Sequence, residues 1–160
     1  MSTYSQIYVH AVFGVKGKNS LILPAWEQEF HKYIVETSAM RELKIHAING
    51  MPDHLHVLVG LKPTWCVSDM VREIKRYSNN YVQDRRLTKY DFQWQEGFAA
   101  FSCSHSSLAQ VVAYIEGQKE HHRHHSFREE YAALLLEHGL DLKNRHVFEW
   151  IDEDTGAEPE

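Results

Sequence analysis

Hydrophobic and polar residues alternate with a period of two in several short stretches of the chain. The stretch 6–13 (QIYVHAVF) is β-branched and aromatic and is followed by Gly14, which predicts a strand. The same alternation over 44–49 and 54–60, around the turn-forming sequence Gly-Met-Pro-Asp, predicts a hairpin. A fourth strand is expected over 92–103, with a bulge at Gly97.

Other stretches repeat their apolar residues at steps of three and four, which is the period of a helix. Pro24 stands near the start of one such stretch and predicts a helix over 24–40. Further helices are expected over 67–86, 108–124 and 127–137. Four serines between positions 102 and 107 indicate a flexible connector before the third helix.

The order strand, helix, strand, strand, helix, strand predicts an α+β fold. An antiparallel sheet of the split β-α-β kind carries helices packed on it, and an extra helix follows the last strand. With 160 residues, the chain has the length of one ordinary domain. We expect a single domain over 1–150 and an acidic, disordered tail over 151–160.

Composition places the chain among ordinary folded proteins, because 43% of its residues are hydrophobic and 24% are charged. No apolar run approaches the roughly 18 to 20 residues that cross a bilayer, and the first residues lack a signal-peptide pattern. The sequence therefore predicts a cytoplasmic protein with no membrane partner. Cys66 and Cys103 are far apart, so we expect buried thiols rather than a disulfide framework or a zinc site.

The net charge of −5 is concentrated at the end of the chain. Six acidic residues and no basic residue lie in the last twelve positions, which leaves 17 basic against 16 acidic residues over 1–148. A nucleic-acid surface would therefore have to be a local basic patch rather than a property of the whole molecule.

Two of the twelve histidines, His54 and His56, lie in the strand expected over 54–60. Side chains alternate along a strand, so both imidazoles point to one face of the sheet. Two neutral imidazoles on one face can hold a divalent metal ion and leave positions open for substrate oxygens. Two histidines on a polar sheet face would give the same pattern, and both interpretations remain open at this point.

Tyr114 and Gln118 are four residues apart in the helix expected over 108–124, and so lie on one face of it. A phenol can act as a covalent nucleophile when a cation or base lies nearby, and the Gln118 carbonyl oxygen could bind the same cation. Tyr114 could equally be a core aromatic residue. The histidine run 121–125 that follows could form a second metal site, although a polar, frayed helix end accounts for it more simply.

The helix expected over 67–86 carries a polar stripe opposite its apolar one. Such a stripe can follow a phosphate backbone and offer amides to bases, although a solvated helix face explains it almost as well. The candidate DNA-binding residues are Arg72, Lys75, Arg76, Asn79, Gln83 and Arg86.

Four features together resemble one known family. They are His10 in the first strand, D-H-L-H-V-L-V at 53–59, W-Q-E-G-F at 94–98 and A-Y-I-E-G-Q-K-E-H-H at 113–122. The chain is similar from about Tyr4 to Trp150 to the single-tyrosine transposases of the smallest bacterial and archaeal insertion sequences. These transposases belong to the His-hydrophobe-His (HUH) endonuclease superfamily.

The resemblance implies a ferredoxin-like fold, a homodimer, and cleavage and rejoining of single-stranded DNA beside hairpins, through a 5′-phosphotyrosine. It implies Tyr114 as the nucleophile, and His54, His56 and Gln118 as ligands of a divalent metal, Mg²⁺ or Mn²⁺. The serine connector further suggests that Tyr114 of one protomer serves the histidine pair of the other. Two alternatives remain: a domesticated or plasmid-type nicking enzyme acting on hairpin repeats, and a catalytically inactive hairpin-binding module.

Overall fold

An antiparallel sheet forms the centre of the fold in the computed structural model, which describes residues 1–140, 150 and 151. The strand order is β2-β3-β1-β4. This order places the first and third strands in the middle of the sheet, as in a ferredoxin-like fold, and confirms the predicted fold class. The strands are β1 (Tyr8–Gly14), β2 (Lys44–Met51), β3 (His54–Gly60) and β4 (Ala99–Cys103).

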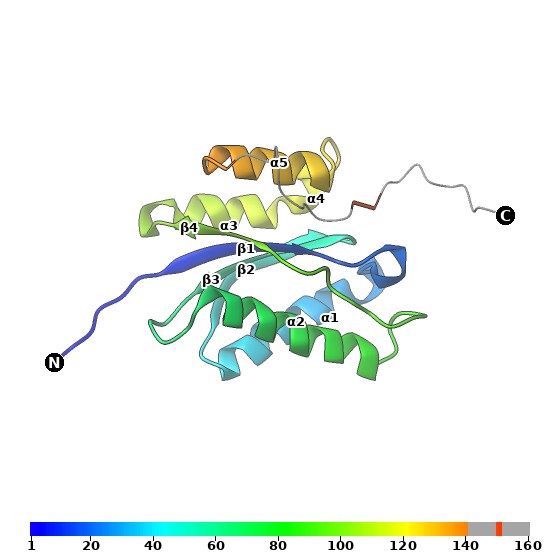
Figure 1. The fold of residues 1–160 in the computed structure, drawn as a ribbon, viewed down its shortest axis with the longest axis horizontal. Coiled ribbons are helices and arrows are strands. Elements are labelled where there is room, and N and C mark those ends of the chain that lie inside the picture. The colour runs from blue at the N-terminus through cyan, green and yellow to red at the C-terminus, as the bar shows by residue number, and fades with distance from the viewer. Residues whose placement is uncertain (141–149, 152–160) are drawn as a thin grey trace.

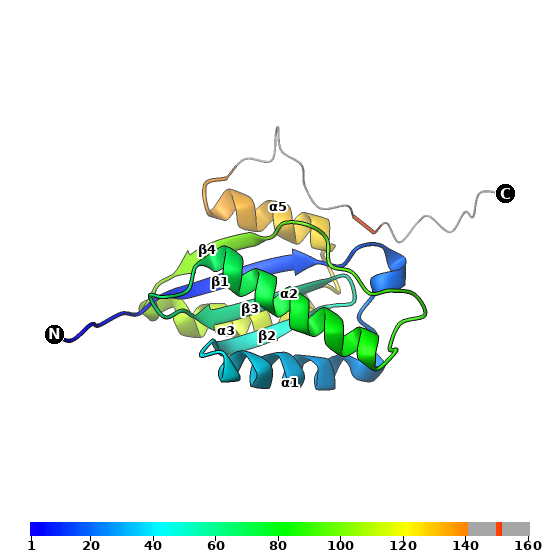
Figure 2. The same cartoon turned by 60° about the horizontal axis from the view of Figure 1, so that its bottom comes forward.

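Helices cover both faces of the sheet (Figures 1 and 2). Helices α1 (Pro24–Met40) and α2 (Val67–Asp84) lie on one face. The other face carries α3 (Leu108–Glu116), α4 (Gln118–His121) and α5 (Phe127–Glu137). Two short 3-10 helices complete the described elements, η1 (Lys18–Ser20) and η2 (His105–Ser107).

The main apolar core lies between the sheet and the pair α1 and α2. Alternate residues of β1 and β3 enter it, because strand side chains point to opposite faces in turn. They pack on fully buried side chains of the two helices, such as Phe30 and Ile74. The strand residues of this core include Val9, Ala11, Phe13, Leu55, Val57 and Val59.

The opposite face has two smaller apolar clusters at its two sides. Phe127, Tyr131 and Leu134 dock α5 on β1 and β4. On the other side, Ile115 of α3 packs on Leu58 of β3 and on β2. These contacts fix α3 and α5 over the sheet and leave a polar space between them.

The prediction of a strand over 92–103 is wrong for its first half, because β4 begins only at Ala99. Trp94 forms a single isolated bridge with Val15, and Gly97 has a φ of 81°, which an extended strand does not allow. The carbonyl oxygens of Gln95 and Gly97 accept hydrogen bonds from Lys75 Nζ at 2.8 and 2.7 Å instead of joining a ladder.

The helix expected over 108–124 is divided at Gly117 and ends earlier, at His121. The serine segment before it is not a loose connector either. Ser104 accepts a hydrogen bond from the backbone N–H of Ser107 and caps η2, which leads directly into α3. The tyrosine helix is therefore tied to its own sheet by an ordered turn.

The expected burial of the thiols is also corrected. Cys66 is exposed, and its Sγ accepts a hydrogen bond from the Asp69 N–H at the start of α2, while Cys103 is only half-buried. Within the described ranges, no helix has the length and apolar character to span a bilayer. The acidic tail expected over 151–160 falls almost wholly outside the described residues.

Candidate active site

Strand β3 places both histidines of the predicted pair on the face covered by α3, α4 and α5. His54 and His56 are completely buried, while Leu55 and Val57 between and after them enter the main apolar core. The neighbouring strand must come very close here, because a Cβ on Gly50 would lie 2.1 Å from the His54 carbonyl oxygen. Glycine at position 50 therefore helps to fix the backbone that carries His54.

Tyr114 and Gln118 reach the same point from the helices above the sheet. The ring centroid of Tyr114 lies 5.9 Å from that of His56. The side-chain oxygen Oε1 of Gln118 lies 3.2 Å from Nε2 of His54, and Gln118 is fully buried. The structure thus brings all four residues selected from the sequence into one cluster, within a single chain.

A residue that the sequence analysis missed lies at the centre of this cluster. Glu130 of α5 is only 2% exposed. Its Oε1 lies 2.9 Å from Nε2 of His56 and 3.2 Å from Nε2 of His54. Its Oε2 accepts hydrogen bonds from Gln118 Nε2 at 2.7 Å and from the Tyr114 hydroxyl. One carboxylate therefore contacts all four of the predicted residues.

The sequence did contain a signal for Glu130. Phe127, Tyr131 and Leu134 form the buried stripe of α5, and Glu130 belongs to the same stripe by helical spacing. Burying a carboxylate costs free energy unless the carboxylate is paired. An acidic residue in an apolar stripe therefore means either that the buried face of the helix is assigned wrongly or that the residue belongs to a functional site. To choose between the two, one must know which face of α5 packs on the sheet, and only the structure shows this.

The histidine run 121–125 adds a further group to the cluster rather than a separate metal site. His122 has a side chain that is 4% exposed, and its Nε2 lies 3.2 Å from Glu130 Oε1 and 3.0 Å from Gln118 Oε1. The His121 ring lies beside Tyr114, with centroids 5.7 Å apart. His124 and His125 are exposed, as expected for a polar helix end.

Each buried imidazole of the cluster also has a second partner, on its other nitrogen. His54 Nδ1 lies 2.7 Å from Asp53 Oδ1, and His56 Nδ1 lies 2.8 Å from Nε2 of His10. His122 Nδ1 lies 2.7 Å from the carbonyl oxygen of His125. Such outer partners fix the orientation of imidazoles and are typical of histidines that bind metal ions.

Burial and these contacts change the pKa values of the cluster. Burial lowers the pKa of His56 to about 4 and that of His10 to about 3. Burial acts the same way on His54, but its hydrogen bonds to Asp53 and Glu130 outweigh it and raise its pKa. Burial, and next the hydrogen bond to Glu130, raise the pKa of Tyr114 well above its ordinary value. Without a further cation the phenol is therefore held protonated.

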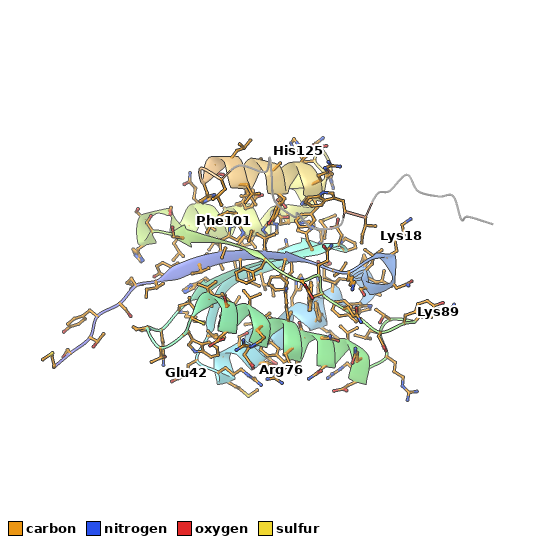
Figure 3. All side chains as sticks on the ribbon, in the orientation of Figure 1. Lys18, Glu42, Arg76, Lys89, Phe101 and His125 are labelled. Carbon is orange, nitrogen blue, oxygen red and sulfur yellow. The ribbon has the colours of Figure 1, made fainter. Side chains whose placement is uncertain are left out.

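Five of the six candidate DNA-binding residues lie on α2 and Arg86 lies just after it, on the opposite face of the sheet from the cluster. Figure 3 shows this separation, with Arg76 on α2 and His125 on the turn before α5 at opposite sides of the molecule. Arg72 and Arg76 pair with Asp69 and Glu73 on the exposed surface of the same helix. Lys75 is instead directed at the backbone of the loop before β4.

Four of the six line one groove, which we call the α2 groove. Arg72, Lys75, Arg76 and Asn79 share it with Lys16 of the loop after β1, with the loop before β4, and with Tyr131 of α5. The groove thus runs along the β4 edge of the sheet toward the helix that carries Glu130. Gln83 and Arg86 are not among its lining residues, and Gln83 Nε2 instead donates to the Phe92 carbonyl oxygen at 3.4 Å. Arg86 lies just after the end of α2 with a φ of 52°.

Comparison with known proteins identifies the class to which this fold and cluster belong. The family model described as "Transposase IS200 like" matches residues 3–118, well over half of the chain. The chain therefore belongs to the IS200-like transposase family of single-tyrosine HUH enzymes, which confirms the resemblance seen in the sequence.

Individual relatives agree with this assignment. Over 120 residues the chain is 22% identical to the ISDra2 transposase TnpA of Deinococcus radiodurans, covering 72% of this chain and 86% of that protein. A solved structure from Deinococcus radiodurans R1, described as a transposase, has a TM-score of 0.59 and 20% identity, covering 74% of this chain and 95% of its own. A REP-associated tyrosine transposase bound to a REP hairpin has a TM-score of 0.53 and 20% identity, covering 73% and 72% of the two chains.

Proposed function

We propose that this transposase cleaves and rejoins single-stranded DNA at insertion-sequence ends through a 5′-phosphotyrosine on Tyr114. The observation that carries the proposal is the convergence of Tyr114, His54, His56 and Gln118 on one buried point in a chain of this family. The Tyr114 ring packs against two apolar clusters, but it is only half-buried and lies beside an imidazole and a carboxylate, which are surroundings that suit a nucleophile.

The residues of the cluster fit a divalent metal ion, Mg²⁺ or Mn²⁺. The ligand atoms of His54, His122 and Glu130 lie within 4.8 Å of one another, which is a spacing that one ion can bridge. His54, His56 and Gln118 would hold the ion through imidazole nitrogens and the amide oxygen. When bound, the ion would neutralise charge on the phosphate and favour the ionised phenol.

The reaction follows from the groups of the chain. The Tyr114 oxygen attacks phosphorus while the bond from phosphorus to the 3′ oxygen breaks. This leaves a 5′-phosphotyrosine and, once the departing oxygen takes up a proton from solvent, a free 3′-hydroxyl. Glu130 Oε2 already accepts a hydrogen bond from the phenol and is in place to take its proton. A second 3′-hydroxyl then attacks the same phosphorus and releases Tyr114, so rejoining needs no nucleotide cofactor.

The proposed substrate is single-stranded DNA that carries hairpins. The α2 groove supports this, because it combines Lys16, Arg72 and Arg76 with the half-buried aromatic ring of Phe98. A structural neighbour of the same fold is bound to a REP hairpin. Gln83 and Arg86 remain candidates for contacts beyond the groove.

The direct test is to incubate the chain with labelled single-stranded DNA from its own locus and Mn²⁺, and to look for an adduct that survives denaturation. The wild type should form the adduct, whereas Tyr114→Phe should form none and should bind the hairpin within a few-fold of the wild type. Tyr90→Phe is the matched control and should form the adduct, because the Tyr90 phenol is exposed and lines neither the cluster nor the α2 groove. Hairpin binding by the wild type without any adduct would favour the inactive binding module.

We also propose that the chain forms a homodimer in which Tyr114 can exchange between the two histidine pairs. In the single chain, Tyr114 lies beside its own His56, so exchange would require α3 to leave this position. Mixing His56→Ala and Tyr114→Phe under conditions of subunit exchange should restore cleavage, with the adduct on the His56→Ala chain. Heterodimers without recovered cleavage would show that each protomer works with its own tyrosine.

A further inference from the structure

We infer that the segment after the family-matching region supplies two more metal ligands, His122 just after α4 and Glu130 of α5. The centre would then be a site for a first-row transition-metal ion such as Mn²⁺ in preference to Mg²⁺. This inference rests on the metal-dependent function proposed above and specifies its metal site. Glu130 lies twelve residues beyond Gln118, where the family match ends.

The first argument is the proton position on two of the imidazoles. Nδ1 of His54 faces a carboxylate oxygen of Asp53, and Nδ1 of His122 faces the carbonyl oxygen of His125. Both oxygens only accept hydrogen bonds, so each neutral ring must carry its proton on Nδ1. The Nε2 atom of each ring then presents a lone pair to the interior of the cluster.

The second argument is that the atoms facing these two lone pairs are themselves hydrogen-bond acceptors. Both Nε2 atoms lie 3.2 Å from Glu130 Oε1, which is itself an acceptor. The NH₂ group of Gln118 donates to Glu130 Oε2, and this hydrogen bond fixes the orientation of the amide. The amide oxygen Oε1 of Gln118 therefore points at Nε2 of His54, at 3.2 Å, and at Nε2 of His122, at 3.0 Å. When both rings are neutral, these four atoms are all acceptors, and a cation satisfies all four at once.

The third argument is the rigidity and composition of the donor set. The apolar contacts of Phe127, Tyr131 and Leu134 hold α5 on the sheet, and the Phe127 ring stacks on His54 at 3.9 Å. Glu130 is thereby fixed in the cluster. Imidazole nitrogens favour transition metals, whereas Mg²⁺ prefers oxygen ligands and keeps several waters. Three imidazoles around one carboxylate oxygen, all nearly inaccessible to solvent, favour the transition metal.

The test is calorimetric titration of the metal-stripped full chain with MnCl₂ and with MgCl₂. The wild type should bind Mn²⁺ at least ~10-fold more tightly than Mg²⁺. Glu130→Gln keeps the size of the side chain and should weaken Mn²⁺ binding by ~10- to 100-fold, as should His122→Asn. The matched controls, Glu129→Gln in the same turn of α5 and His124→Asn in the same histidine run, are exposed and should bind like the wild type.

Unchanged Mn²⁺ affinity in both Glu130→Gln and His122→Asn, with loss in His54→Ala, would overturn the inference and leave the proposed function in place. Failure of the wild type to bind any metal would overturn the inference as well, and adduct formation would then decide the proposed function separately. Circular dichroism should first establish that each variant is folded. If Glu130→Gln does not fold, the comparison of His122→Asn with His124→Asn answers the same question.

Discussion

The two faces of the sheet are built from the same strands but obey different physical rules. On the face of α1 and α2, strand residues such as Phe13 and Leu55 pack among apolar side chains, where volume and shape decide stability. On the opposite face, His54 and His56 join a buried polar network around Glu130, where every donor needs an acceptor. We therefore expect the first face to tolerate exchanges of similar volume and the second to be sensitive to the loss of one polar atom.

Within the single strand β3, residues that face the polar cluster alternate with residues that face the apolar core. In β3, neighbouring residues face opposite sides, so the chain can place chemistry at every second position without disturbing the core below. Substitutions of adjacent residues should therefore have different kinds of effect. The predictions below use this contrast, beginning with the largest expected effect.

The sharpest contrast is between His56→Ala and its neighbour Val57→Ala. His56→Ala removes an imidazole that contacts Glu130, and we expect it to lower single-strand cleavage by about 1,000-fold or more. Val57→Ala should leave the cleavage rate of the folded protein within ~3-fold, because Val57 faces the apolar core. Adduct formation under single-turnover conditions measures both. Equal losses in the two variants would contradict the separation of the faces.

Leu55→Ala tests the contribution of the apolar face to the stability of the protein. Leu55 is fully buried in the main core, and the cavity should lower the free energy of unfolding by about 3 kcal/mol. Urea denaturation followed by circular dichroism provides the measurement. Leu136→Ala, an exposed leucine of α5, is the control and should change stability by less than ~0.5 kcal/mol.

A half-buried histidine of α1, on the apolar side of the sheet, should make stability depend on pH. Burial lowers the pKa of His31 of α1 to about 4, although Glu27 opposes this, so the unfolded chain takes up a proton at a higher pH than the folded one. His31 then contributes stability that is complete above pH 6.5 and falls toward pH 4. We expect a loss of roughly 2 kcal/mol over that interval, reduced in His31→Gln but not in the exposed control His124→Gln. Urea unfolding at several pH values gives the slope, and equal slopes in all three proteins would contradict the assignment.

Gln118→Ala should weaken cleavage by ~10-fold, less than either histidine variant, because water can replace a neutral amide oxygen on a hard cation. The measurement is the adduct rate at saturating Mn²⁺. A loss as large as that of His56→Ala would mean that Gln118 acts chiefly by holding Glu130, to which its amide donates at 2.7 Å.

The smallest effect is expected in the α2 groove. Arg72→Ala should weaken hairpin binding a few-fold and reduce the slope of log affinity against log salt concentration by about 1. Lys32→Ala removes an exposed charge from α1, outside the groove, and is the matched control. Titrations of labelled hairpin at several salt concentrations distinguish the two. Equal slopes in both variants would assign DNA binding to another surface.

The sequence by itself determined the order of elements, the apolar core and four members of the cluster. Each of these depends on local periodicity or on a short motif. His54 and His56 are separated by one strand residue, and Tyr114 and Gln118 by one helical turn, so each pair could be placed on a common face from spacing alone. The strand expected before Ala99 failed because Lys75, twenty residues away from Gln95, takes the carbonyl groups of that segment.

Only the tertiary structure decided that Glu130 and His122 join the cluster. Both residues are far from the histidine pair along the chain. Glu130 follows His56 by 74 residues, for example, and no local pattern encodes a contact over such a separation. It arises because the apolar stripe of α5 docks on β1 and β4 and carries a carboxylate with it. Burial then makes that carboxylate significant, because a charge removed from water must find partners, and the imidazoles, the amide and the phenol beneath α5 provide them.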